Sequence, residues 1–132
     1  MKRLIILLFI AASQIAFAAE PRGTIEGNLG YPSEYIPAMK VCAQHVESKH
    51  IICKKLTSIN YKTAKYSLKL PAGNYYIFAQ LLHREGDITT KHRAYYSEFV
   101  TCGAKVGCPS HKHIAITVQA NETLNNIDPT DW

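Results

Sequence analysis

Hydrophobic and polar residues alternate along most of the chain after residue 22, with the period of two that is typical of β-strands. Between residues 66 and 70, tyrosine or leucine alternates with serine or lysine, which predicts a strand with one solvent-exposed face. Residues 74–82 are largely apolar on both faces, so we expect that strand in the middle of a sheet, covered on both sides. Pro71 and Gly73 lie between the two segments and predict a turn that folds the second strand back on the first, with Gly73 able to adopt positive φ.

Five further segments show the strand pattern, and no segment after the first eighteen residues has helical periodicity of useful length. They are Gly23–Leu29, Ala38–Val46, His50–Thr57, Arg93–Val100 and a strand from Ile114 that includes Ile116 and Val118. Residues 57–65, 83–92 and 101–113 read as loops, and the tail 121–132 can dock through Ile127 and Trp132. The sequence therefore predicts an all-β fold, a seven-stranded antiparallel Greek-key β-sandwich.

The first eighteen residues have the composition of a signal peptide. Two basic residues precede the apolar run Leu4–Ile10, which is too short to span a membrane, and Ala16–Ala18 supplies the small residues that a signal peptidase recognises. We expect cleavage after Ala18 and export of a single domain, residues 19–132, to the periplasm or outside the cell. The exported form would not span the membrane. An uncleaved anchor is the alternative.

All four cysteines follow the predicted signal peptide, and an even number in an exported chain predicts two disulfides. Three pairings of Cys42, Cys53, Cys102 and Cys108 are open. We favour Cys42–Cys53 and Cys102–Cys108, because each pair brackets a short segment that resembles a hairpin or a loop. If Cys42 faces Cys53, the more apolar face of that hairpin points inward and the disulfide lies on the outer face. The absence of a C-x-x-C pair argues against zinc, and we expect no cofactor.

The formal net charge of +5 falls to +3 without Lys2 and Arg3. The basic residues are scattered, and Lys54 and Lys55 form the densest pair of the exported part. Nucleic-acid binding requires a clustered basic stripe, so the sequence predicts no nucleic-acid partner.

Three stretches, GTIEG at 23–27, IPAMKV at 36–41 and YSLKLPAGNY at 66–75, resemble the carboxypeptidase regulatory-like domain, a relative of the transthyretin-like sandwich. The L-P-A-G-x-Y element is the most specific of them. The resemblance covers roughly residues 23–82 and implies a β-sandwich that acts as a noncatalytic folding, adhesion or binding module. The four cysteines and residues 95–100 lie outside the general pattern of that family and suggest a more specialised subgroup.

Two pairs of neighbouring tyrosines, Tyr75 with Tyr76 and Tyr95 with Tyr96, are candidates for ligand binding. Whichever tyrosine of each pair points outward could form an aromatic surface together with Glu98, suited to sugars or protein surfaces. Packing of most of these rings in the core is the alternative. The binding residues that we name are Tyr76, Tyr95, Tyr96 and Glu98. We therefore predict a noncatalytic binding or accessory module for a protein or glycan of the cell envelope or the extracellular space.

Two other functions are open. A periplasmic metal-binding protein would use His111 and His113, completed by Glu98 or His92. An inhibitor of an exported hydrolase would use the disulfide-braced loop between Cys102 and Cys108. Enzyme activity is not expected. Ser97, His92 and Glu98 are the only close set for hydrolysis, and on a strand Ser97 and Glu98 would point to opposite faces.

Overall fold

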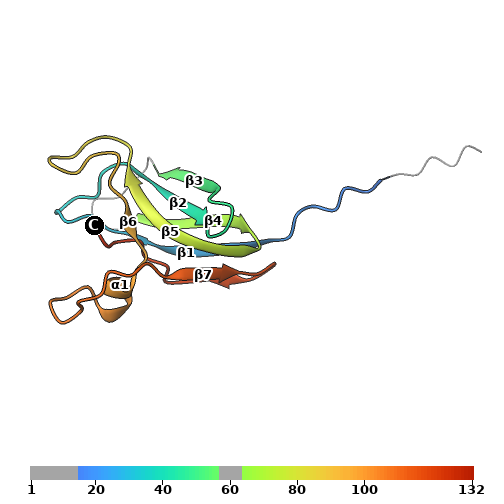
Figure 1. Ribbon diagram of the computed structural model, residues 1–132. Coiled ribbons are helices and arrows are strands. Elements are labelled where there is room, and N and C mark those ends of the chain that lie inside the picture. The colour runs from blue at the N-terminus through green and yellow to red at the C-terminus, as the bar shows by residue number, and fades with distance from the viewer. Residues whose placement is uncertain (1–14, 57–63) are drawn as a thin grey trace, which may run out of the picture.

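A computed structural model describes residues 15–56 and 64–132, which form two β-sheets and one short helix (Figure 1). The elements are β1 (Arg22–Leu29), β2 (Met39–His45), β3 (Ile51–Leu56), β4 (Ala64–Pro71), β5 (Gly73–Leu81), β6 (Ala94–Tyr95), α1 (Glu98–Cys102), β7 (Ala115–Val118) and β8 (Thr123–Leu124). Most of the predicted signal peptide and of the predicted turn at 57–65 lies outside the described residues. No helix within the described residues is long and apolar enough to cross a membrane.

The strands form a three-stranded sheet in the order β4-β1-β8 and a five-stranded sheet in the order β3-β2-β5-β6. Strand β7 also pairs with β5, on residues 73–76, whereas β6 pairs with residues 78–79. All pairs are antiparallel except β1 with β8, which is parallel. The all-β prediction is confirmed. The prediction of seven antiparallel strands is corrected in two respects, since the described residues contain eight strands and one parallel pair.

The core lies between the two sheets, and the strand alternation places it there. On β1, Ile25 and Leu29 are buried, whereas Glu26 and Asn28 are exposed, as the sequence predicts. On the central strand β5, alternate residues from Tyr75 to Leu81 point into the core. The core residues shared by both sheets are Ile25, Leu29, Met39, Val41, Ala43, Tyr66, Leu68, Leu70, Tyr75, Ile77, Ala79, Leu81, Ile116 and Val118. Burial of this apolar surface is the main favourable contribution to folding.

The chain does not form a hairpin at Pro71–Gly73. Strand β4 pairs with β1 and strand β5 pairs with β2, so the corner carries the chain from one sheet to the other. Gly73 is also not in the left-handed region. Its role is close approach, because a Cβ there would lie 3.0 Å from Nε2 of His45. The Tyr75 hydroxyl donates to the carbonyl oxygen of Pro71 (2.9 Å) and fixes the corner.

Both favoured disulfides are present, Cys42–Cys53 and Cys102–Cys108. Cys42 lies directly opposite Cys53 in the β2–β3 register, and Met39, Val41 and Ala43 point into the core, as expected for that register. The loop of this hairpin spans residues 46–49, since the backbone N–H of His45 donates to the carbonyl of His50. The disulfide therefore lies on the outer face of the five-stranded sheet.

The predicted strand Arg93–Val100 is wrong beyond Tyr95. Only Ala94 and Tyr95 form β6, and α1 begins at Glu98, within the segment expected to be extended. The helix ends at Gly103, whose φ of 114° allows its N–H to bond the carbonyl of Val100. The predicted loop 101–113 therefore begins with the end of a helix. A five-residue helix is too short to show helical periodicity, so the two-residue alternation predicted a strand instead.

The tail docks through both predicted residues. Ile127 joins the core, and its carbonyl oxygen accepts a hydrogen bond from the Tyr66 hydroxyl (2.6 Å). The indole N–H of Trp132 donates to the carbonyl of Gly30 (2.7 Å), and its ring packs edge-on against Tyr31. The tail also contains strand β8, which the sequence did not predict.

The buried phenol of Tyr66 makes the stability depend on pH in a specific way. Burial raises the pKa of Tyr66 well above its ordinary value, and the negative charge of Asp128 raises it further. In the unfolded chain the phenol ionises near pH 10, whereas the folded protein keeps it protonated. Its contribution to stability is thus complete below about pH 10 and is lost as the pH rises above it.

We expect Tyr66→Phe to lower the free energy of unfolding by about 1 kcal/mol at neutral pH, because the hydrogen bond to Ile127 is lost. This deficit relative to the wild type should shrink above about pH 10. Denaturant unfolding of both proteins at several pH values measures the difference. A difference that stays constant across this range would contradict the assignment.

Candidate functional site

The outer face of the five-stranded sheet carries a row of apolar and aromatic groups. Cys53, Cys42, Phe78 and Tyr95 are direct neighbours across β3, β2, β5 and β6. Phe78 points away from the core, yet it is only 1% exposed. The Tyr95 ring (centroids 5.5 Å apart) and the Arg93 guanidinium (4.3 Å from the ring centre) cover it. Phe78 is thus a buried apolar contact surface for the partly exposed ring of Tyr95.

Three rings lie next to one another on this face, and we call them the ring cluster: Tyr76, Tyr95 and His113. The imidazole of His113 stacks on Tyr95 with centroids 3.6 Å apart and planes 11° apart. Tyr76 meets the same imidazole edge-on at 6.1 Å. The cross-strand neighbour of Tyr76 is Ala115, whose small side chain leaves the tyrosine ring uncovered on that side. Tyr76 and Tyr95 are partly exposed, and His113 is exposed.

A shallow hollow of about 390 Å³ adjoins the ring cluster, lined by Tyr76, His111, Lys112 and His113. Its lining combines a phenol, two imidazoles and an ammonium group. Such a surface can pack against an apolar or sugar ring and can donate hydrogen bonds or positive charge to an anionic group.

Segment 110–113 is held in place by Asp131. Nδ1 of His111 lies 2.8 Å from Oδ1 of Asp131, and the buried Ser97 hydroxyl donates to Oδ2 at 2.5 Å. The His111 ring also stacks on Phe99 with centroids 4.5 Å apart. The carboxylate stands between the serine and the histidine, so Ser97 donates its proton to Asp131 and not to an imidazole base. This arrangement positions the segment that carries His113, and it differs from the order of groups that activates a serine nucleophile.

The structure brings together half of the predicted binding residues. Tyr76 and Tyr95 share the outer face through His113, whereas Tyr96 packs against the core and Glu98 lies at the start of α1, where it accepts a hydrogen bond from Ser110. The contribution of His113 to this face was missed. His113 lies two residues before Ala115, which is exposed, whereas Ile116 is buried. Continuing this alternation back along the chain would have placed the His113 side chain on the outer face.

The histidines named for a metal site have separate contacts. His111 pairs with Asp131, His113 stacks on Tyr95, and His92 bonds Thr89 through its Nδ1. Among the described residues, no group of three or more His, Cys, Asp or Glu side chains could hold a metal ion. The proposed donor sets with Glu98 or His92 are thus not assembled in the structure.

The loop closed by Cys102–Cys108 projects beside α1, away from the two sheets (Figure 1). Its apolar tip, Val106, is fully exposed. The backbone N–H of Cys108 donates to the carbonyl of Lys105, so residues 105–108 form a tight turn. The loop therefore gives an inhibitor an exposed apolar tip, but not the extended backbone that pairs with another chain as a strand.

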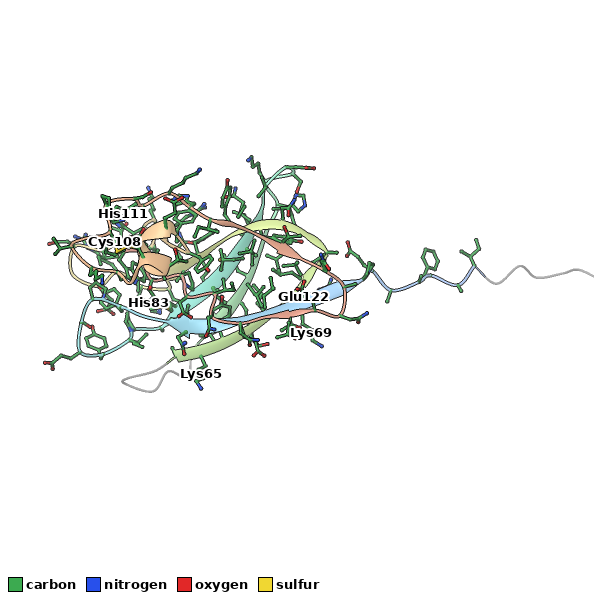
Figure 2. All side chains as sticks on the ribbon, turned by 90° about the horizontal axis from the view of Figure 1, so that it is seen from below. Lys65, Lys69, His83, Cys108, His111 and Glu122 are labelled. Carbon is green, nitrogen blue, oxygen red and sulfur yellow. A yellow bond between two sulfur atoms is a disulfide. The ribbon has the colours of Figure 1, made fainter. Side chains whose placement is uncertain are left out.

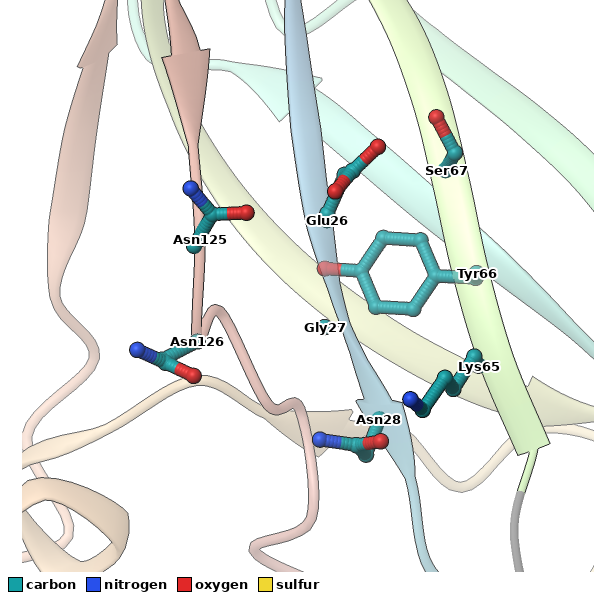
Figure 3. Close-up of a pocket in the computed structure, with 8 residues that line it drawn as sticks. All are labelled: Glu26, Gly27, Asn28, Lys65, Tyr66, Ser67, Asn125 and Asn126. Carbon is teal, nitrogen blue, oxygen red and sulfur yellow. The ribbon is translucent and has the colours of Figure 1, made fainter.

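A second hollow of about 390 Å³ lies on the outer face of the three-stranded sheet (Figure 3). Its lining is mostly polar and consists of Glu26, Gly27, Asn28, Lys65, Tyr66, Ser67, Asn125 and Asn126. The Tyr66 ring is buried and its hydroxyl is bonded to Ile127, so it offers no free ring face. This hollow can form hydrogen bonds with a ligand, but it lacks the exposed rings that add apolar contact on the other sheet.

Comparison with known proteins gives no family for this chain. No protein-family model and no curated protein matches the sequence. A solved leucine-rich repeat protein from Bacteroides thetaiotaomicron is similar over 84% of this chain, with 15% sequence identity and a TM-score of 0.43. This chain spans 14% of that protein. A likeness at this level supports no argument about fold family or function.

Proposed function

We propose that the protein is an exported, noncatalytic binding module that recognises a glycan or a protein in the cell envelope or outside the cell. The observation that carries this proposal is the ring cluster of Tyr76, Tyr95 and His113 on the outer face of the five-stranded sheet. Tyrosine offers a large contact area with a polar tip and loses little conformational freedom on binding. The two disulfides support export, because such bonds persist in oxidising compartments.

The rigidity of the ring cluster supports a binding role. Tyr76 lies on β5, which is paired with strands on both edges, and Tyr95 lies against the buried Phe78. His113 follows a segment that Asp131 fixes through His111. Groups held by strands and hydrogen bonds lose little further freedom when a ligand binds, so more of the contact energy contributes to affinity.

Two further parts of the proposal have separate support. The noncatalytic role is consistent with the separation of Ser97, His92 and Glu98, which contact Asp131, Thr89 and Ser110 respectively. Membership of the carboxypeptidase regulatory-like group, with Greek-key connections, rests on the sequence resemblance. The two-sheet β architecture is compatible with it.

The ring cluster is tested by the double variant Tyr76→Ala, His113→Ala. We expect its affinity to fall at least tenfold while its unfolding midpoint stays close to that of the wild type, because both side chains are at least partly exposed. Binding is measured on immobilised purified polysaccharides and on detergent-extracted envelope proteins. Tyr35→Ala, an exposed tyrosine whose hydroxyl bonds Glu85, is the matched control.

Unchanged binding in the double variant would overturn the proposal. Loss of binding in Asn28→Ala, Asn125→Ala, with the ring-cluster variant unaffected, would move the site to the polar hollow of the three-stranded sheet.

A further inference from the structure

The strands of the five-stranded sheet carry positive charge that nothing on them balances. Strands β2, β3, β5, β6 and β7 contain no Asp or Glu, whereas β2 and β3 contain Lys40, Lys54 and Lys55. Lys54 donates to the backbone carbonyl of Ser67 (2.9 Å). Within the described part of the chain, the one ion pair joins His111 and Asp131. Lys40 and Lys55 thus have no acidic partner there.

Lys40 and Lys55 lie directly opposite each other in the β2–β3 register. Directly opposed residues project on the same face, and like charges in such a pair destabilise a sheet. Lysines on edge strands prevent unwanted strand pairing, which accounts for Lys55 on β3 but not for Lys40 on the interior strand β2. Because protection of the sheet edge does not explain Lys40, we expect this unfavourable lysine pair to have another function.

The Cys42–Cys53 disulfide holds this lysine pair in place. It joins the same two strands two residues away and lies on the same outer face, so the strands cannot separate to relieve the repulsion. Gln80 is the neighbour of Lys40 on β5, and its side chain belongs to this face as well. The register thus places the Lys40 and Lys55 side chains next to each other, beside Gln80, whose amide donates to the carbonyl of Thr90. Two neighbouring ammonium groups are a suitable contact for an anionic group.

The lysine pair and the ring cluster lie on one continuous face. Gln44 is the cross-strand neighbour of Tyr76 and is four residues from Lys40, about 13 Å along β2. Lys112 and His111 border the ring cluster from the loop side. The lysine pair on the strands and Lys112 in the loop thus provide positive charge near the rings, with the side chains of Gln44 and Gln80 on the same face. An extended ligand with flat apolar faces, hydroxyl groups and spaced negative charges fits this order.

We propose that the ligand of this face is an acidic glycan, whose sugar rings pack on Tyr76 and His113 and whose carboxylate or sulfate groups contact Lys40 and Lys55. This inference rests on the binding function proposed above and adds the chemical class of the ligand. A neutral glycan would leave the lysine pair without a role. An acidic protein is the competing ligand class.

The test uses dextran and dextran sulfate, which share a backbone and differ in charge, together with polygalacturonate as the carboxylate form. We expect the protein to bind both acidic polymers at least tenfold more tightly than dextran. The variant Lys40→Gln, Lys55→Gln should lose at least tenfold in affinity and show a weaker dependence on salt. The matched control is Arg22→Gln, Lys69→Gln on β1 and β4 of the three-stranded sheet, which removes the same charge outside both described hollows and should change affinity less than about threefold (Figure 2).

Each other outcome overturns this inference. Equal losses in the Lys40→Gln, Lys55→Gln variant and in the control would mean general charge attraction. Capture of an acidic protein through Lys40 and Lys55 would mean the wrong ligand class. Binding of a neutral glycan that depends on Tyr76 and His113 would overturn the acidic class and leave the proposed function intact. Absence of any binding that depends on the ring cluster would overturn both. Circular dichroism checks that the charge variants are folded. We expect Lys40→Gln, Lys55→Gln to fold, because it removes a repulsion.

Discussion

Replacing Gly27 by valine is expected to lower the free energy of unfolding by about 3 kcal/mol and to detach the tail from the sandwich. A Cβ on Gly27 would lie 2.0 Å from the carbonyl oxygen of Ile127 and 2.6 Å from its carbonyl carbon. Both are backbone atoms, so no side-chain rotation relieves the clash. The tail would have to move, and the hydrogen bonds of Ile127 to Glu26 and Tyr66 would be lost with it.

Trp132 provides a direct readout for this prediction, because it is the single tryptophan of the chain. In the folded protein its indole bonds Gly30 and packs against Tyr31. Detachment of the tail should shift its fluorescence to longer wavelength and open it to quenchers. Gly107→Ala is the matched control, since a Cβ there has no neighbour within 4 Å, and its stability should change by less than about 0.5 kcal/mol. Wild-type fluorescence and an unchanged unfolding midpoint in Gly27→Val would refute the prediction.

Removal of the Cys42–Cys53 disulfide has the second largest expected effect. The chain-entropy relation gives a loss of about 3 kcal/mol for its sequence separation of 11, and about 2 kcal/mol for the separation of 6 in Cys102–Cys108. Each disulfide joins one buried cysteine, Cys42 or Cys108, to one exposed cysteine, so the longer closed segment decides the order. We therefore expect Cys42→Ala, Cys53→Ala to be less stable than Cys102→Ala, Cys108→Ala.

Denaturant unfolding of the two double variants under identical conditions measures this order. Since Cys42–Cys53 also holds Lys40 opposite Lys55, its removal should weaken binding of acidic polymers, whereas removal of the loop disulfide should leave that binding nearly unchanged. A loop-disulfide variant that is the less stable of the two would contradict the order expected from segment length.

The local pattern predicted most strands because burial of one face leaves a direct mark on the sequence. The alternation in β1 and β4, the inward face of β2 and the central position of β5 all follow from it, although Tyr76 and Gln80 on the outer face of β5 are only partly covered. Pairing partners leave no such mark. The corner at Pro71–Gly73 looks the same in sequence whether it closes a hairpin or crosses between sheets, because its local geometry does not report which strands accept the hydrogen bonds.

The candidate site was predicted in part for the same reason. Tyr76 and Tyr95 were selected by residue type, and their outward direction follows from strand parity. The contact of His113 with both depends on β6 and β7 meeting the same edge of β5, which is a property of the fold. Tyr96 packs against the core, which is the alternative that the alternation with Tyr95 left open, and Glu98 lies at the start of a helix that the two-residue alternation did not reveal.

Strands β6 and β7 follow one another along a single edge of β5, and this arrangement has a consequence for how the chain can change. The N–H of Ile114 donates to the carbonyl of Tyr96, and Ser97 forms a bridge with His113, so the segment between them starts and ends at one point of the sheet. Residues 98–112, with α1 and the Cys102–Cys108 loop, therefore form an insertion between the two strands, and its length does not affect the strand register. Grafting foreign peptides at this position is a practical route to display them on a disulfide-stabilised scaffold.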